Sequence, residues 1–134
     1  MLRLMIGLVA WASLLGGFGA RAEAGAVKAL FSYADWCAPC ELLQPKLEAA
    51  AADVRGVEIV YIDFTDLSIE NQNRQIAKAY PLSFDDFFVN ERFVKTGFAY
   101  VLVDGESKAT ISAGMSKADI ETVLRAAVSQ ATGP

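Results

Sequence analysis

The order of elements along the 134-residue chain predicts one α/β domain, with a central mixed β-sheet flanked by helices. Three observations carry this prediction. Two apolar, β-prone runs in the first half are each followed by a segment with helical spacing, which is typical of parallel strands joined by helices. In the second half, the turn signal Asp104-Gly105 separates two strand-like runs. An amphipathic helix then closes the chain.

The first half contains two strand–helix units. Val27 to Tyr33 is mostly apolar and predicts a buried central strand. A helix is expected to begin near Cys37, because apolar residues then recur at helical spacing at Leu42, Leu43, Leu47 and Ala50. Val57 to Asp66 is the second β-prone run. A second helix is expected over Ser68 to Ala79, ending before Pro81.

The second half begins with a less regular segment. Phe84 to Gly97 carries four phenylalanines, which we expect in the core, with the lining of a groove as the alternative. Phe98 to Gly114 predicts a β-hairpin. Ser116 is the expected N-cap of the closing helix, whose apolar face is Ile120, Val123, Leu124, Ala127 and Val128. Residues 131–134 are expected to form a loose tail.

The N-terminus has the three parts of a secretory signal peptide. Arg3 is followed by an apolar run from Leu4 to about Ala20 and by small-x-small sites, so we expect a signal peptide over residues 1–22, cleaved after Ala22 or Ala24. The alternative is an uncleaved membrane anchor, although the run is near the lower length limit for a bilayer and contains three glycines. In a bacterium the destination would be the periplasm, where disulfides persist.

Composition excludes several classes of function. The chain has no histidine, which excludes Ser-His-Asp and Cys-His catalysis and removes the commonest metal ligand. The net charge is −4, and it becomes −6 when Arg3 and Arg21 leave with the leader, with ten basic residues against sixteen acidic ones. Nucleic acid is therefore not expected as a partner, because phosphate binding needs a basic surface.

The two cysteines, Cys37 and Cys40, allow three interpretations. A metal site would need a second chain, as an intermolecular zinc or iron–sulfur site, because two sulfurs do not fill a four-ligand shell. A structural disulfide would close a very short loop in a domain large enough to fold without one. A redox pair is the interpretation that the sequence favours.

The context of these cysteines resembles a known family. Trp36-Cys37-Ala38-Pro39-Cys40 follows a buried strand and opens a helix, as in the active site of the thioredoxin superfamily. The stretch "VDGESKATISAGMSKADIETVL" resembles that fold's closing hairpin and helix, including Gly-x-Ser-Lys at Gly114 to Lys117. The resemblance covers about residues 27–129. It implies a thioredoxin fold over residues 25–130 and an exported thioredoxin-like thiol:disulfide oxidoreductase.

Three features depart from the family pattern. The family places a buried acid six residues before the first cysteine, and Phe31 stands there in this chain. Ala99, or Phe98 on a different count of the hairpin, stands where the family has a cis-proline facing the cysteines. We therefore expect a trans peptide and an altered groove at that point. The segment at about 66–96 is longer than in a minimal thioredoxin.

The resemblance also assigns roles to individual residues. Cys37 would be the nucleophile, because its place at the start of a helix favours the thiolate, and Cys40 would resolve the mixed disulfide. Pro39 would hold the first turn rigid. Two walls of a substrate groove are implied, one made of Trp36, Ala38 and Pro39, and the other of Gly97, Phe98 and Ala99.

The expected function is thiol–disulfide exchange on protein disulfides without a metal or cofactor. Ala38 and Pro39 add no charge or side-chain donor that would stabilise the Cys37 thiolate, so we expect the reducing side of the family. The implied partners are protein thiols or disulfides and a membrane-bound redox donor, and a monomer is expected. The alternative is a binding module or holdase that grips partners in the groove without turnover.

Overall fold

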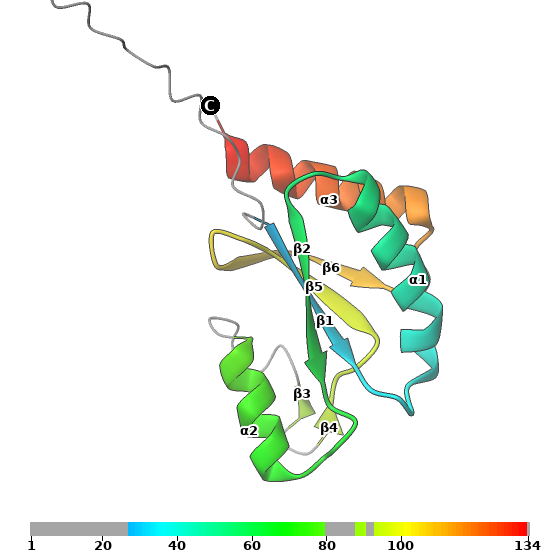
Figure 1. The fold of residues 1–134 in the computed structure, drawn as a ribbon, viewed down its shortest axis with the longest axis vertical. Coiled ribbons are helices and arrows are strands. Elements are labelled where there is room, and N and C mark those ends of the chain that lie inside the picture. Colours follow the sequence, from blue (N-terminus) through cyan, green and yellow to red (C-terminus); the bar gives the residue numbers. More distant parts are fainter. Residues whose placement is uncertain (1–26, 80–87, 91–92, 134) are drawn as a thin grey trace, which may run out of the picture.

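The computed structural model describes residues 27–79, 88–90 and 93–133 (Figure 1). The expected signal peptide lies outside these residues, and so do the side chains of the four phenylalanines between Phe84 and Gly97. Within the described ranges, every helix is too short or too polar to cross a membrane.

A four-stranded mixed sheet forms the centre of the molecule, as predicted. Its order is β2 (Val57–Asp63), β1 (Val27–Tyr33), β5 (Phe98–Val103) and β6 (Glu106–Ser112). β1 runs parallel to β2 and antiparallel to β5, and β5 pairs antiparallel with β6. A separate two-stranded sheet, β3 (Phe88–Asn90) with β4 (Phe93–Val94), was not predicted.

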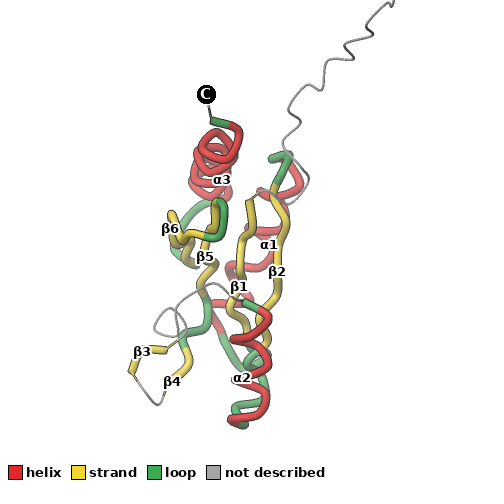
Figure 2. Tube along the Cα trace, turned by 90° about the vertical axis from the view of Figure 1, so that its left-hand side faces the viewer, coloured by secondary structure: helices red, strands yellow, loops and turns green. Residues whose placement is uncertain are grey.

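Three helices cover the two faces of this sheet. α1 (Ala38–Asp53) and α3 (Lys117–Thr132) pack against one face, and α2 (Ile69–Lys78) lies against the other (Figures 1 and 2). α1 begins one residue after Cys37, near which a helix was expected, and α2 lies one residue inside each of its expected bounds. α3 continues to Thr132 and so includes the first two residues of the segment expected as a loose tail.

Alternation along the central strands divides the core into two clusters. Phe31 and Ala99 lie in the first cluster, with α1 and α3, together with Val27, Ala29, Val101 and Val103. Leu30 and Tyr100, which are next to Phe31 and Ala99 in the chain, lie in the second cluster with Ile62, Phe64 and Leu102. Successive strand residues point to opposite faces, which explains the division. Both cysteines belong to the first cluster.

Local signals in the sequence account for the turn and the last helix. Asp104 and Gly105 have φ values of 50° and 80°, so both central residues of the β5–β6 turn adopt the left-handed conformation of a type I′ hairpin. Ser116 caps α3: its side chain accepts from the Asp119 amide, and the Asp119 carboxylate accepts from the Ser116 amide. The predicted hairpin and N-cap are confirmed.

Candidate redox site at the start of α1

Cys37 and Cys40 are joined as a disulfide at the start of α1. Cys37 is the N-cap and Cys40 lies in the first turn, which brings their Cα atoms to 5.3 Å. Cys37 is 5% exposed and Cys40 1% exposed. A reagent in solution therefore meets Cys37 first.

The start of α1 supplies hydrogen-bond donors to Cys37. The Cys40 amide lies 3.3 Å from the Cys37 Sγ atom, and the Cys37 carbonyl accepts from the amides of Cys40 and Glu41. Pro39 occupies an early helical position, where the amide it lacks has no partner within the helix. When the disulfide is open, the Cys40 amide and the positive end of the helix dipole favour a thiolate at Cys37.

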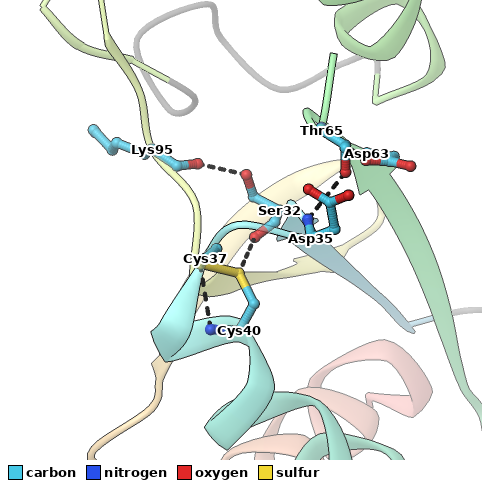
Figure 3. The surroundings of a disulfide bond; sticks show 7 residues. All are labelled: Ser32, Asp35, Cys37, Cys40, Asp63, Thr65 and Lys95. Carbon is cyan, nitrogen blue, oxygen red and sulfur yellow. Dashed lines mark hydrogen bonds between the residues drawn. A yellow bond between two sulfur atoms is a disulfide. The ribbon is translucent and has the colours of Figure 1, made fainter. Parts of the chain in front are cut away.

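Trp36 lies next to the pair and is held by the turn after β2. Its indole Nε1 donates to the Thr65 carbonyl at 3.2 Å. The Asp35 amide donates to Thr65 Oγ1 at 3.0 Å (Figure 3). Trp36 is nevertheless 52% exposed, and Ala38 and Pro39 are exposed as well. These three side chains, all adjacent to Cys37 or Cys40 in the chain, are open to a partner.

Gly97 lies opposite the pair, in the segment that enters β5. It is buried, and its φ of 86° is one that side chains with a β-carbon rarely adopt. A β-carbon on Gly97 would lie 2.9 Å from Pro39 Cβ and 3.5 Å from Cys37 Sγ. The backbone of this segment therefore approaches the disulfide closely because residue 97 has no side chain.

Phe98 and Ala99 lie on opposite faces of β5. Ala99 is fully buried in the first core cluster, so it lines no surface groove, and Phe98 packs against the second cluster on the other face. The residue that faces the cysteines is Gly97, one or two positions earlier than the expected slot. Gly97 therefore borders the disulfide at Cys37 Sγ, and Ala99 shares the first core cluster with both cysteines.

Phe31 fills the position of the expected acid with an aromatic ring. It is fully buried, and its ring centroid lies 6.1 Å from that of Tyr33 and 5.9 Å from that of Tyr61. Among the described residues, the only buried polar side chains are Ser32 and Asn71. No carboxyl group in this part of the chain is therefore buried beside Cys40.

Ser32 is a site residue that the sequence analysis missed. Its hydroxyl donates to the Lys95 carbonyl at 2.5 Å (Figure 3). Its own carbonyl accepts from the Gly97 amide at 2.8 Å. The same carbonyl oxygen lies 3.7 Å from Cys40 Sγ. The only signal in the sequence was a small polar residue inside an apolar strand. Its partners are 63 and 65 residues away.

The chemistry that this arrangement can perform is two-electron exchange between a dithiol and a disulfide. Within the described ranges, no group of three Cys, Asp or Glu side chains is placed to hold a metal ion. Both cysteines are buried, and Cys37, at 5% exposed, is the more accessible of the two. One sulfur can therefore meet a partner while the other is kept for the intramolecular step.

The chain is similar to known proteins in sequence pattern and in fold. The family model described as thioredoxin matches residues 25–95. Trxlp from Edwardsiella tarda shares 17% identity over 77% of this chain and 86% of its own, with a TM-score of 0.50. A thioredoxin from Malassezia sympodialis shares 17% identity over 82% of this chain and 80% of its own, with a TM-score of 0.45. A thiol:disulfide interchange protein of the thioredoxin family from Chlorobium tepidum shares 20% identity over 80% of this chain and 83% of its own, with a TM-score of 0.48. A search of curated proteins gave no match.

Proposed function

The chain belongs to the thioredoxin family, and we propose that it is an exported oxidoreductase that reduces disulfides in other proteins through Cys37 and Cys40. Family membership and a cysteine pair at disulfide distance support thiol–disulfide exchange. The reducing direction, the export and the individual roles of the residues are our proposal. The observation that carries it is the placement of the pair, with Cys37 at the N-cap of α1 and Cys40 beneath it.

The proposed reaction begins with the reduced pair. The Cys37 thiolate attacks one sulfur of the substrate disulfide; a Cys37–substrate bond forms, the substrate S–S bond breaks, and the electron pair leaves with the other substrate sulfur, which takes up a proton. Cys40 then loses its proton and attacks Cys37 Sγ, and the bond from Cys37 to the substrate breaks. The second substrate sulfur leaves with the electron pair and takes up the proton that Cys40 lost. The substrate has gained two electrons and two protons, and the Cys37–Cys40 disulfide remains.

A reducing direction requires a supply of electrons. A membrane-bound dithiol donor would attack the Cys37–Cys40 disulfide, become oxidised to a disulfide itself, and return the pair to its reduced form. The direction is supported by Ala38 and Pro39, which place no charge or side-chain donor between the cysteines. A strong oxidant owes its potential to extra stabilisation of the thiolate form, which these two residues do not supply.

Protein substrates are favoured by the apolar side chains exposed near the pair. Trp36, at 52% exposure, is tied to Thr65, and Leu67 and Ile69 follow in the next residues at 53% and 77% exposure. Apolar side chains that gather on one part of the surface are typical of sites that meet another protein. Export is proposed from the signal-peptide pattern of residues 1–22, with the periplasm as the destination, or the membrane if the leader stays uncleaved.

Reduction of insulin by dithiothreitol tests the proposal. The wild-type protein should accelerate it, and Cys37→Ser should abolish the acceleration, whereas the matched variant Ser112→Ala on strand β6 should not change it. Activity that survives in Cys37→Ser would overturn the proposal. Binding of unfolded chains that is equal in wild type and Cys37→Ser, without turnover in either, would instead identify a holdase.

Two further measurements address direction and partners. The reduction potential of the pair, measured in glutathione buffers, should lie near that of the reducing members of the family, and a strongly oxidising value would contradict the proposed direction. Cys40→Ala should trap mixed disulfides in cells, because Cys37 can still attack but nothing resolves the product. The trapped partners then identify the substrates, and a Cys37→Ser/Cys40→Ala double variant is the control that should trap none.

A further inference from the structure

We propose that Ser32 is a positioning residue for the exchange reaction, because it holds residues 95–97 against the disulfide and so sets the wall that a protein substrate meets. This inference rests on the proposed function. Ser32 is not part of the cysteine motif. It is the last but one residue of β1, five positions before Cys37, and it is fully buried.

Ser32 binds the segment at two points. Its side chain reaches Lys95 through the bond from Oγ to the Lys95 carbonyl, at 2.5 Å. Its main chain reaches Gly97, whose amide donates to the Ser32 carbonyl at 2.8 Å. The second bond is of the kind that any residue at position 32 would make. The first requires a hydroxyl, and it fixes the segment two residues before Gly97.

The place of this segment matters because Gly97 lies against Cys37. A β-carbon on Gly97 would be 3.5 Å from Cys37 Sγ, so the backbone at residue 97 borders the path of an attacking or leaving sulfur. A polypeptide substrate that reaches Cys37 Sγ must lie against this border and against the exposed side chains of Trp36 and Ala38. A displacement of about 1 Å in a positioning element can change a rate by orders of magnitude.

The Ser32 carbonyl also connects this segment to the resolving sulfur. The oxygen that accepts the Gly97 amide lies 3.7 Å from Cys40 Sγ, and a carbonyl oxygen has two lone pairs. In the reduced protein, the Cys40 thiol can donate to the second lone pair. Ser32 thus contacts both the Cys40 sulfur and the segment that borders the Cys37 sulfur.

Comparing two disulfide substrates separates positioning from a general structural role. Reduced Ser32→Ala should reduce insulin at least five-fold more slowly than wild type, mainly through a higher KM, because the wall for a polypeptide is displaced. Its reaction with oxidised glutathione, which needs little of that wall, should stay within two-fold. Ser32→Thr keeps the hydroxyl and should restore insulin reduction to within two-fold of wild type. Ser112→Ala, a serine-to-alanine change on β6, is the matched control.

Hydrogen exchange of the Gly97 amide gives a readout that does not depend on activity. In the folded wild type this amide should be protected, because it donates to a buried carbonyl. In Ser32→Ala its exchange should be at least ten-fold faster, while amides of β2 keep their rates. If Ser32→Ala does not fold, the exchange rate of the Gly97 amide in wild type is decisive. An unprotected amide there would overturn the proposed contact between Ser32 and residues 95–97.

The remaining outcomes are equally informative. If Ser32→Ala folds and reduces insulin like wild type, or if its reactions with insulin and glutathione fall by the same factor, the positioning role is overturned. A wild-type protein that reacts with neither disulfide would overturn the proposed function itself, and this role with it. The two failures can therefore be told apart. If only the inference is wrong, the wild type is active and Ser32→Ala gives one of the contrary results; if the proposed function is wrong, the wild type itself is inactive.

Discussion

Gly97 and Pro39 meet across the disulfide so closely that a β-carbon on Gly97 would lie 2.9 Å from the Cβ atom of Pro39. Both backbones are fixed, Pro39 by its ring and helix and Gly97 by its bond to Ser32. Gly97→Ala should therefore lower the free energy of unfolding by about 2–4 kcal/mol, the sum of left-handed strain and overpacking. Urea denaturation measures this loss.

Gly114→Ala is the control for that prediction. A β-carbon on Gly114 would meet no atom within 4 Å, and its φ does not lie in the left-handed region. Its free energy of unfolding should stay within about 0.5 kcal/mol of wild type. Equal effects of the two substitutions would show that the close approach of Gly97 to Pro39 does not exist in solution.

Placing the family's acid at position 31 should lower the free energy of unfolding. The Phe31 ring is fully buried between Tyr33 and Tyr61, so Phe31→Asp removes core packing and puts a carboxyl in its place. Loss of the ring alone costs about 3–5 kcal/mol, and the buried carboxyl adds to this. Phe31→Leu should cost less than about 2 kcal/mol. Similar denaturation midpoints for the two variants would contradict this account of the core.

The N-cap of α3 offers a test outside the redox site. Ser116→Ala removes the acceptor for the Asp119 amide and should lower the free energy of unfolding by about 1 kcal/mol. Ser129→Ala, an exposed serine in the last part of the same helix, should change it by less than about 0.5 kcal/mol. Thermal denaturation followed by circular dichroism compares the two, and an equal response would argue against the cap.

The pH response of Tyr61 can be followed by its phenolate absorbance. Burial and the hydrogen bond from its hydroxyl to Glu48 raise the pKa of Tyr61 to about 12. The folded pKa lies above the unfolded value of 10, so the stability that this group contributes is complete below pH 10 and is lost as the pH rises through 12. Glu48→Gln should lower the pH at the midpoint of the Tyr61 titration without returning it to 10, because the burial of Tyr61 remains. A midpoint of 10 in wild type would contradict the packing of Tyr61.

The pKa of Glu48 is shifted in the opposite direction, downward. Its hydrogen bonds with Tyr61 and then Gln44 hold the pKa of the carboxyl below 4.5. Its contribution is therefore present above pH 4.5 and is lost as the pH falls through the lowered value. Tyr61→Phe should raise the Glu48 pKa, which NMR titration of the carboxyl carbon measures. An unchanged value would show that Gln44, not Tyr61, dominates.

The sequence predicted most of the fold because its signals are local. β1 has the expected bounds, and the Asp104-Gly105 turn and the Ser116 cap lie where residue types alone place them. The cysteine pair was also predicted correctly as a pair in a helix start. Each of these depends on residues that lie within a few positions of one another.

The opposite wall of the site was predicted less well because its position depends on tertiary contacts. The expected slot fell on Phe98 or Ala99, whereas Gly97 faces Cys37. Gly97 lies just before β5, and which of residues 97–99 borders a sulfur depends on how the chain enters the strand, which hydrophobic alternation does not reveal. Ser32 was missed because its partner Lys95 lies 63 positions away and accepts through its backbone carbonyl. Every residue type has such a carbonyl, so the sequence does not indicate this partner.

The membership of both cysteines in the first core cluster links the redox couple to folding by a thermodynamic cycle. The oxidised and reduced proteins share one interior, so any change that stabilises one form over the other shifts the reduction potential by the same free energy. About 1.4 kcal/mol corresponds to about 30 mV for a two-electron couple. Substitutions at core positions such as Leu43 or Phe31 are therefore routes for adjusting the potential without touching a residue between the cysteines.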